Sequence, residues 1–239
     1  MMIIVVMATV FSGCGQMQED RDTVSPIQAS GEIKLPQPSY DSGTSIEKTL
    51  LNRRSVREYK DDPLTLKEVS QLLWAAQGLT DPGGARIAPS AGALYPLEVY
   101  LVAGNVEGLK SGVYRYVPDG HKLVLIKEGD IRNELGRAAV EQASVGDGAI
   151  DIVISGVYER TTGKYNTQVH DDLTGADYPR GVKYVHMEAG HASQNVYLQA
   201  ESLGLGTVTI GAFDDAELKR LTGMSDEERP LYVMPVGRV

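Results

Sequence analysis

The sequence predicts an α+β fold in which helices and hairpin-linked strands build a sandwich, and three observations support this prediction. First, two strand candidates at 112–117 and 122–126 are joined by a Pro-Asp-Gly turn, which is a strong hairpin signal. Second, the other strands and helices do not follow the regular strand–helix–strand repeat of a parallel sheet. Third, a long segment at 184–203 carries apolar or small residues on more than one helical face, which is typical of a helix buried on several sides.

The first helix of the domain is expected over 45–54. Ile46, Leu50 and Leu51 lie on one helical face there, and a serine or threonine precedes them as an N-cap. The second helix is expected over 65–77, because its apolar stripe follows a Thr-x-x-Glu capping box and ends at a glycine.

The remaining elements are predicted from periodicity and turn signals. Strands are expected at 97–103, 112–117, 122–126, 149–158, 206–212 and 231–236, and helices at 131–142, 184–203 and 214–222. Asp214 and Glu217 mark the start of the last helix. The acidic stretch at 166–180 is typical of a solvated surface loop.

The composition fits a folded protein that does not bind nucleic acid. Its 239 residues are enough to bury a sizeable core. The formal net charge is −9, so the molecule as a whole repels the phosphate backbone of DNA and RNA. Local basic clusters therefore carry more information than the total charge.

The first fourteen residues, MMIIVVMATVFSGC, form an apolar run with the length of a signal-peptide core. They fall far short of the roughly 20 residues that a helix needs to span a bilayer. Cys14, the only cysteine, follows a Phe-Ser-Gly sequence that resembles the lipobox of bacterial lipoproteins, in which the cysteine is lipidated. We therefore expect a lipid anchor at Cys14 and a location at the cell envelope, outside the cytoplasmic membrane. The alternative is an incidental cysteine in the apolar terminus of a cytoplasmic protein.

Residues 15–44 are predicted to form a polar tether, and residues 45–239 are predicted to form the folded domain. The tether contains prolines and glycines and shows neither helical nor strand periodicity. Its last part is able to pack on the domain.

The sequence RRSVREY at 53–59 concentrates positive charge at the expected end of the first helix. This arginine cluster consists of Arg53, Arg54, Ser55 and Arg57. Arginine presents a fork of donors that suits phosphate, and a serine hydroxyl adds a neutral donor. The cluster therefore either binds an anion such as phosphate or lies on a solvated turn, paired with the acidic residues at 58–62.

A second candidate site lies at 88–98, in the sequence APSAGALYPLE. Its residues have little side-chain bulk, so the backbone amides can approach a flat ligand closely. The stretch is either a ligand-facing loop or a tight turn of small residues.

Several separated motifs occur in the same order as in the nitroreductase-like flavoproteins. They are RRSVREY, LLWAAQG, RIAPSAGALYPLEVYLV, EAGHASQNVYLQAESLGLGTVTIGAF and VMPVGRV. Over residues 45–239 the chain resembles this family, and most of all its SagB-type dehydrogenase branch. The resemblance implies a three-layer sandwich, in which helices flank a mixed, mainly antiparallel sheet and the long buried helix is central. It also implies a homodimer with FMN bound at the interface of the two subunits.

The resemblance assigns the candidate residues to parts of an FMN site. The phosphate-binding residues of the family correspond to Arg53, Arg54, Ser55 and Arg57. The stretch beside the flavin ring, here called the ring loop, corresponds to Pro89, Ser90, Ala91, Gly92 and Ala93. Many nitroreductases have an asparagine in place of the last alanine, and its absence favours the SagB-type branch. The backbone of Gly211 and Ala212 corresponds to the family segment that lies near the flavin edge where hydride arrives. In many relatives, a basic residue after the last strand also contacts the phosphate, and Arg238 is the local substitute for it.

Lys183 and Tyr184 match a Lys-Tyr pair that azoline oxidases of this branch carry just before their Gly-His helix. A lysine with a lowered pKa can remove a proton while a flavin takes up hydride. The pair is therefore expected to be catalytic, and the alternative is a surface lysine beside a tyrosine that starts the helix. His186 and His191 are five residues apart, which does not place two ligands on one helical face, so no metal site is expected.

Taken with the resemblance, the sequence predicts an FMN-dependent oxidoreductase. Its substrate would be a small organic molecule or a peptide, and its electron donor NAD(P)H or, outside the cytoplasm, a quinol. Contact with the membrane is expected through the lipid anchor only. The alternative function is a non-catalytic flavin-binding sensor or interaction protein of the cell envelope.

Overall fold

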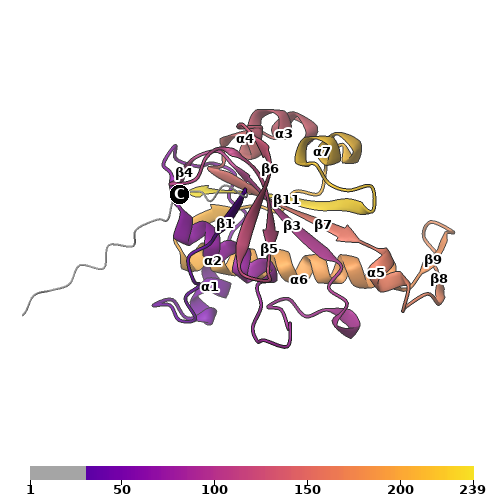
Figure 1. Ribbon diagram of the computed structural model, residues 1–239. Coiled ribbons are helices and arrows are strands. Elements are labelled where there is room, and N and C mark those ends of the chain that lie inside the picture. The colour runs from indigo at the N-terminus through magenta and orange to yellow at the C-terminus, as the bar shows by residue number, and fades with distance from the viewer. Residues whose placement is uncertain (1–30) are drawn as a thin grey trace, which may run out of the picture.

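A seven-stranded sheet forms the middle layer of the molecule (Figure 1). The computed structural model describes residues 31–239. The strands follow the order β1-β6-β5-β3-β7-β11-β10, and every neighbouring pair among them is antiparallel. They are β1 (Glu32–Lys34), β3 (Leu97–Ala103), β5 (Gly112–Val117), β6 (Lys122–Glu128), β7 (Ile150–Val157), β10 (Leu205–Thr207) and β11 (Glu228–Arg238). The predicted α+β fold with a mainly antiparallel sheet is confirmed.

Helices cover both faces of this sheet and complete a three-layer sandwich (Figure 1). One face carries α1 (Ile46–Asn52), α2 (Leu66–Gln77) and α6 (Gly181–Ser202), and the other carries α3 (Arg132–Ala138), α4 (Ala143–Asp147) and α7 (Asp215–Thr222). Along β7, Ile152 and Ile154 point into the core on the α6 side, and Val153 points into the core under α3 and α7. Because both of its faces are covered, this strand is a nearly continuous apolar run.

The helices begin at the predicted caps. Thr65 Oγ1 accepts the backbone N–H of Glu68 at 3.3 Å, and the Glu68 carboxylate accepts the backbone N–H of Thr65 at 2.8 Å. Asp214 caps α7 by accepting the backbone N–H of Glu217 at 2.9 Å, and Ser45 caps α1 in the same way. These bonds satisfy backbone donors that the first turn of a helix leaves unpaired.

The predicted helix at 131–142 is wrong beyond its first half. Val140 and Glu141 have φ angles of 58° and 56°, and α3 has already ended at Ala138. This left-handed backbone is incompatible with a right-handed helix. The chain therefore turns before it starts the separate helix α4.

The strand predicted at 206–212 is also shorter in the structure. β10 ends at Thr207, and Ile210 returns to the sheet only through an isolated bridge with Val233. The segment that follows β10 is therefore available to line a site.

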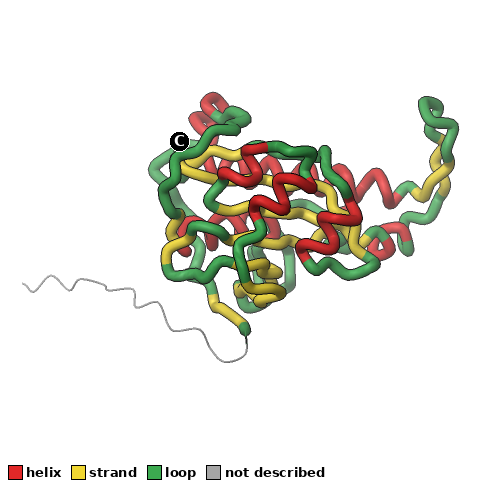
Figure 2. Tube along the Cα trace, turned by 90° about the horizontal axis from the view of Figure 1, so that it is seen from above, coloured by secondary structure: helices red, strands yellow, loops and turns green. Residues whose placement is uncertain are grey.

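The predicted surface loop at 166–180 contains a hairpin. β8 (Gln168–His170) and β9 (Asp177–Pro179) pair antiparallel, and the hairpin projects from the body of the fold in both views (Figures 1 and 2). The remaining short elements are β2 (Leu64–Thr65), β4 (Val106–Glu107), α5 (Glu159–Thr162) and a 3₁₀ turn at Ala91–Ala93.

Residues 31–44, the last part of the predicted tether, pack on the domain. β1 pairs with β6, Leu35 is buried, and the backbone N–H of Ser39 donates to Gln71 Oε1 at 2.8 Å. Cys14, the predicted signal sequence and the first part of the tether lie outside the described residues. Within residues 31–239, no helix combines the length and the apolar character that a membrane span requires.

Two helices of the single chain present apolar side chains to solvent. On α1, Ile46, Leu50 and Leu51 are between 54% and 72% exposed. On α6, one long face packs on the sheet, but Met187 on the opposite side is 57% exposed. The expected burial of α6 on several sides therefore does not hold within one copy. Exposed apolar side chains that lie together, as the three on α1 do, are typical of an interaction surface.

Candidate functional site

The arginine cluster lies beside the C-terminal half of α6. Ser55 forms a parallel bridge with Thr207, which places it at the edge of the sheet. Its hydroxyl lies 3.1 Å from the hydroxyl of Tyr197, and the same tyrosine oxygen accepts the backbone N–H of Thr209 at 2.8 Å. The Arg53 guanidinium lies over the Tyr197 ring, 5.0 Å from its centroid. Tyr197 thus holds the cluster and the segment after β10 together.

The cluster is electropositive and open to an anion. Among residues 31–239, no ion pair involves Arg53, Arg54 or Arg57, so the predicted alternative of pairing with nearby acidic residues is not seen. Burial tends to raise the pKa of Tyr197, but hydrogen bonds with Ser55 and Thr209 and the charge of Arg53 lower it below its ordinary value. Hydrogen bonds to the ionised phenolate are thus the main cause of this lowered pKa, and the Arg53 charge adds to them.

Arg54 differs from its neighbours within the cluster. Its guanidinium donates to the backbone carbonyls of Leu51 and Arg53, at 2.9 and 2.8 Å. It therefore satisfies the free carbonyls at the end of α1, as basic side chains often do at helix C-termini. Arg53, Ser55 and Arg57 remain the stronger candidates for the anion.

The segment after β10 adds two hydroxyls that the sequence did not single out. Within the described part of the chain, the buried Oγ1 atom of Thr207 has no hydrogen-bond partner, and the Oγ1 atom of Thr209 has only the Tyr197 hydroxyl nearby. Because an unpaired buried hydroxyl is costly, this segment is suited to a ligand that supplies polar groups. A ribityl phosphate, with its row of hydroxyls, has the chemistry to do so.

A groove of about 590 Å³ continues from this segment and is lined by Gly211, Tyr158, His186 and Ala189, among others. From Tyr197 to His186, α6 runs for eleven residues, which correspond to a rise of about 16 Å. The arginine cluster and the Gly211 groove are therefore separated by a distance comparable with the length of an extended FMN molecule. The structure brings these two predicted parts of the site onto one side of α6.

The ring loop, in contrast, lies near Tyr184 of the predicted Lys-Tyr pair. Gly92 has a φ of 65°, and a Cβ atom there would lie 2.8 Å from the hydroxyl of Tyr165. The ring of Tyr165 packs edge-on against that of Tyr184, with centroids 4.9 Å apart. Lys183 is exposed, and its Nζ lies 5.7 Å from the ring centroid of Tyr178. Tyr184 is thus placed near the ring loop, as a shared function requires.

α6 separates the ring loop from the Gly211 groove. Each residue of a helix advances by about 100° around the axis, so residues two apart point to nearly opposite sides. His186 faces the groove, whereas Tyr184 and Glu188 face the ring loop and the tyrosine beside it. One copy of the chain therefore does not place the ring loop and the Gly211 groove against the same flat ligand. The predicted site consists of two halves.

Arg238 does not join the arginine cluster. Its guanidinium binds both carboxylate oxygens of Glu68, at 2.6 and 2.9 Å, and donates to the carbonyl of Pro63. This bidentate pair fixes the end of β11 to the start of α2. The assignment of Arg238 to the cofactor is therefore corrected to a structural one.

Strained backbone and buried contacts fix the residues that follow the ring loop. Tyr95 has a φ of 45°, which is unusual for a residue other than glycine. Its backbone N–H donates to Ser90 Oγ at 2.9 Å, its carbonyl accepts from Arg160 at 3.1 Å, and Arg86 lies 4.8 Å from its ring centroid. Such strain persists where the surroundings hold it, and it occurs often at ligand sites.

Glu188 is a buried carboxyl group beside this loop. It is 2% exposed, and within the described chain its Oε1 has no hydrogen-bond partner. Burial raises its pKa to about 7, although the Ser90 hydroxyl and the Arg86 guanidinium counteract part of this effect. Glu188 carries no sequence signal beyond its place in the EAGH motif.

Glu188→Gln is expected to change how stability depends on pH. The pKa of Glu188 is raised from 4.5 to about 7 on folding. The folded state therefore binds this proton more tightly, and its contribution to stability is lost as the pH rises through about 7. Relative to the unsubstituted protein, the variant should gain up to roughly 3 kcal/mol of stability between about pH 5 and about pH 8. Urea unfolding at both pH values measures this gain, and an equal stability difference at both would contradict it.

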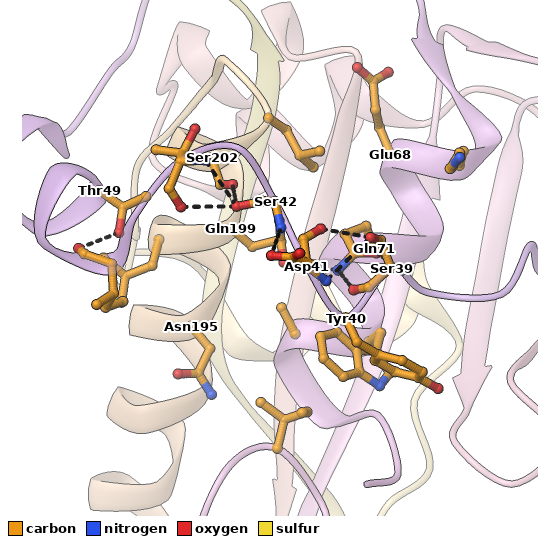
Figure 3. Close-up of a pocket in the computed structure, with 18 of the residues that line it drawn as sticks. Ser39, Tyr40, Asp41, Ser42, Thr49, Glu68, Gln71, Asn195, Gln199 and Ser202 are labelled. Atoms are coloured by element: carbon orange, nitrogen blue, oxygen red, sulfur yellow. Dashed lines mark hydrogen bonds between the residues drawn. The ribbon is translucent and has the colours of Figure 1, made fainter.

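A second cavity of about 670 Å³ lies between residues 39–46, α2 and α6 (Figure 3). The tilted rings of Tyr40 and Trp74 contact each other at one end of it, with centroids 5.5 Å apart. Asn195 and Gln199 of α6 form another wall. None of the predicted site residues lines this cavity. Residues 31–239 also contain no cluster of His, Cys, Asp and Glu side chains that could hold a metal ion.

Comparisons with known proteins point to one family. A family model described as Nitroreductase family matches residues 50–238. A Methanocaldococcus jannaschii protein named as a nitroreductase, MJ1384, is 46% identical over 87% of this chain and 96% of its own length. The microcin B17-processing protein McbC of Escherichia coli is 26% identical over 74% of this chain and 63% of McbC.

Solved structures show the same fold. A crystal structure from Ralstonia eutropha, described as that of a nitroreductase, superposes with a TM-score of 0.71 and 30% identity, over 89% of this chain and 92% of that chain. The microcin synthetase McbBCD complex of E. coli contains a chain that superposes with a TM-score of 0.63 and 23% identity, over 96% of this chain and 84% of that chain.

Proposed function

Because the chain belongs to the nitroreductase family and its relatives indicate an oxidoreductase, we propose that it binds FMN. In this proposal, hydride passes between the flavin and a small organic or peptide substrate. The observation that carries this proposal is the arginine cluster. Its arginines have no carboxylate partner among the described residues, and the cluster continues through the hydroxyls of Thr207 and Thr209 to the Gly211 groove.

The residues present fit FMN in their chemistry. Arg53, Ser55 and Arg57 would hold the phosphate through charge-assisted hydrogen bonds. The hydroxyls of Thr207 and Thr209 would bond the ribityl chain. The backbone N–H groups that follow Ile210 would reach the ring edge, and the flavin would supply the hydride-accepting atom.

A second copy of the chain would complete the site. In this proposal the ring loop of one subunit covers the flavin that the arginine cluster of its partner holds. The exposed apolar residues of α1 and α6 support such a homodimer, because their burial in an interface would contribute roughly 25 cal/mol per Å².

The Lys-Tyr pair and the similarity to McbC and to the trifolitoxin operon protein TfxC support the SagB-type branch and a peptide-like substrate. Lys183 and Tyr184 would then act on the substrate from the ring-loop side, where the Tyr184 ring packs against Tyr165. The electron donor would be NAD(P)H, or a quinol if Cys14 anchors the protein outside the cytoplasmic membrane.

The visible spectrum of the purified full-length protein tests this function. We expect flavin absorbance near that of free FMN, and bleaching of it under anaerobic conditions by NADH, NADPH or a quinol. An absence of flavin absorbance, even after FMN is added, would refute the proposal. Bound FMN that no donor bleaches would instead favour the alternative of a non-catalytic flavin-binding sensor.

A further inference from the structure

A tyrosine and a histidine meet in the Gly211 groove and have no assigned function. The Tyr158 hydroxyl lies 2.5 Å from His186 Nε2, and their rings meet edge to face with centroids 5.5 Å apart. Tyr158 follows β7 at the start of α5, and His186 lies on α6. Both line the groove together with Gly211. Two sheet-flanking elements thus place a proton donor and a proton acceptor at one spot.

The surroundings keep this pair neutral near pH 7. Burial lowers the pKa of His186 and raises that of Tyr158 to about 12. The charged groups that act on Tyr158 are Arg229, which favours its ionised form, and Asp215, which opposes it, and both line the same groove. A neutral imidazole accepts the tyrosine hydrogen at Nε2 and keeps its own hydrogen on Nδ1.

We propose that Tyr158 and His186 form a proton relay between the Gly211 groove and solvent, which serves the substrate during hydride transfer. This inference rests on the proposed function, because it assumes that the flavin edge lies at Gly211. The relay has the exposure that it needs. In the single chain Tyr158 is half-buried and His186 is exposed, so the imidazole can exchange its proton with water.

The chemistry of the relay balances. A substrate that loses hydride to the oxidised flavin is oxidised by two electrons and must also lose a proton to give a neutral product. That proton passes to the Tyr158 oxygen while the tyrosine's own proton passes to His186 Nε2, and the imidazolium then releases a proton to solvent. In the reducing direction, an electrophilic substrate that takes up hydride would also need a proton, which His186 and Tyr158 would pass along the same path in reverse.

A second tyrosine–histidine pair in the molecule shows what a structural pair looks like. Tyr116 is bonded to His121 Nδ1 at 2.8 Å, and the other ring nitrogen of His121 contacts Ser70 and the carbonyl of Pro36. Both nitrogens are engaged, and Tyr116 is 1% exposed. This pair ties the N-terminal segment to α2 and does not line the Gly211 groove. It provides a matched control.

Tyr158→Phe and His186→Gln are expected to lower flavin-dependent turnover by about 10²–10⁴-fold, the usual contribution of a positioned proton-transfer group. Their FMN content should stay that of the unsubstituted protein, because neither residue lies at the arginine cluster. Tyr116→Phe should lower thermal stability and leave turnover within about threefold of the unsubstituted protein, because it breaks a pair outside the groove. Turnover that survives Tyr158→Phe with full FMN content would overturn the relay.

A second measurement does not depend on flavin. The ¹⁵N chemical shifts of His186 in the flavin-free protein report which ring nitrogen carries the hydrogen. We expect the Nδ1–H tautomer, and a return to the common Nε2–H form in Tyr158→Phe. An Nε2–H tautomer in the unsubstituted protein would overturn the proposed direction of the relay. If the histidine shows the expected tautomer but no FMN binds, the proposed function fails and the tyrosine–histidine hydrogen bond stands.

Discussion

Replacing Arg53 and Arg57 together by alanine is expected to strip FMN from the purified protein. Each charge-assisted hydrogen bond contributes about 1.5–3 kcal/mol. The loss of two such bonds should weaken FMN binding by roughly 10²–10⁴-fold. Titration of the apoprotein with FMN, followed by quenching of flavin fluorescence, measures the dissociation constant.

Arg54→Ala is the matched control for this double substitution. It removes an adjacent arginine whose guanidinium is already engaged by the carbonyls at the end of α1. Its FMN affinity should stay within a few-fold of the unsubstituted protein, with a small loss of stability. If the double variant keeps the affinity of this control, the phosphate site has been misplaced.

Gly92→Val is expected to lower turnover roughly 10²-fold by displacing the ring loop. Gly92 has a φ of 65°, and an added Cβ would lie 2.8 Å from Tyr165 and 2.9 Å from Lys164. A β-branched residue does not adopt this backbone conformation without strain, so the ring loop must move. Displacing a ligand-positioning loop by about 1 Å can cost roughly 10²-fold in rate. Steady-state turnover with the donor that bleaches the flavin measures the loss.

Gly129→Val separates backbone strain from the effect on the site. Gly129 has a φ of 102°, and a Cβ atom there would meet no atom within 4 Å. The substitution introduces similar strain in the turn between β6 and α3, so stability should fall while turnover is kept. Equal losses of turnover in both glycine variants would mean that the ring loop does not act on the flavin.

The sequence was most informative where one local cause decides the structure. Thr65 with Glu68 and Asp214 with Glu217 start helices because their side chains cap the first turn, and both caps are present. The turn at 118–120 joins two strands because its residues favour a hairpin. Such signals need no knowledge of distant residues.

The sequence was least informative where contacts between distant segments determine the local structure. Val140 and Glu141 end α3 in a left-handed conformation that their helix propensities do not suggest. Arg238 is a basic residue near the end of the family motif, but its partner Glu68 is 170 residues away. The function of Tyr197 as the link between Ser55 and Thr209 likewise follows only from three-dimensional proximity.

The division of the candidate site by α6 also could not be predicted from the motifs. Their order along the chain groups the ring loop with the arginine cluster, because a linear sequence does not show which side of a helix each motif meets. The periodicity of α6 does contain this information: Tyr184 and His186 are two residues apart, and so point to opposite sides. It becomes useful only once the partners of both residues are known.

The central claim is that two copies of the chain each contribute one half of every flavin site, and intersubunit complementation tests it most directly. At limiting FMN the Arg53→Ala/Arg57→Ala variant and the Gly92→Val variant each have little turnover alone. They are unfolded together, refolded as a mixture and supplied with limiting FMN. Random assortment makes half of the dimers mixed, and each mixed dimer contains one intact site. We therefore predict recovery of about a quarter of the turnover of the unsubstituted protein. A mixture that stays as inactive as its two components would contradict the shared site and would place both halves within one subunit.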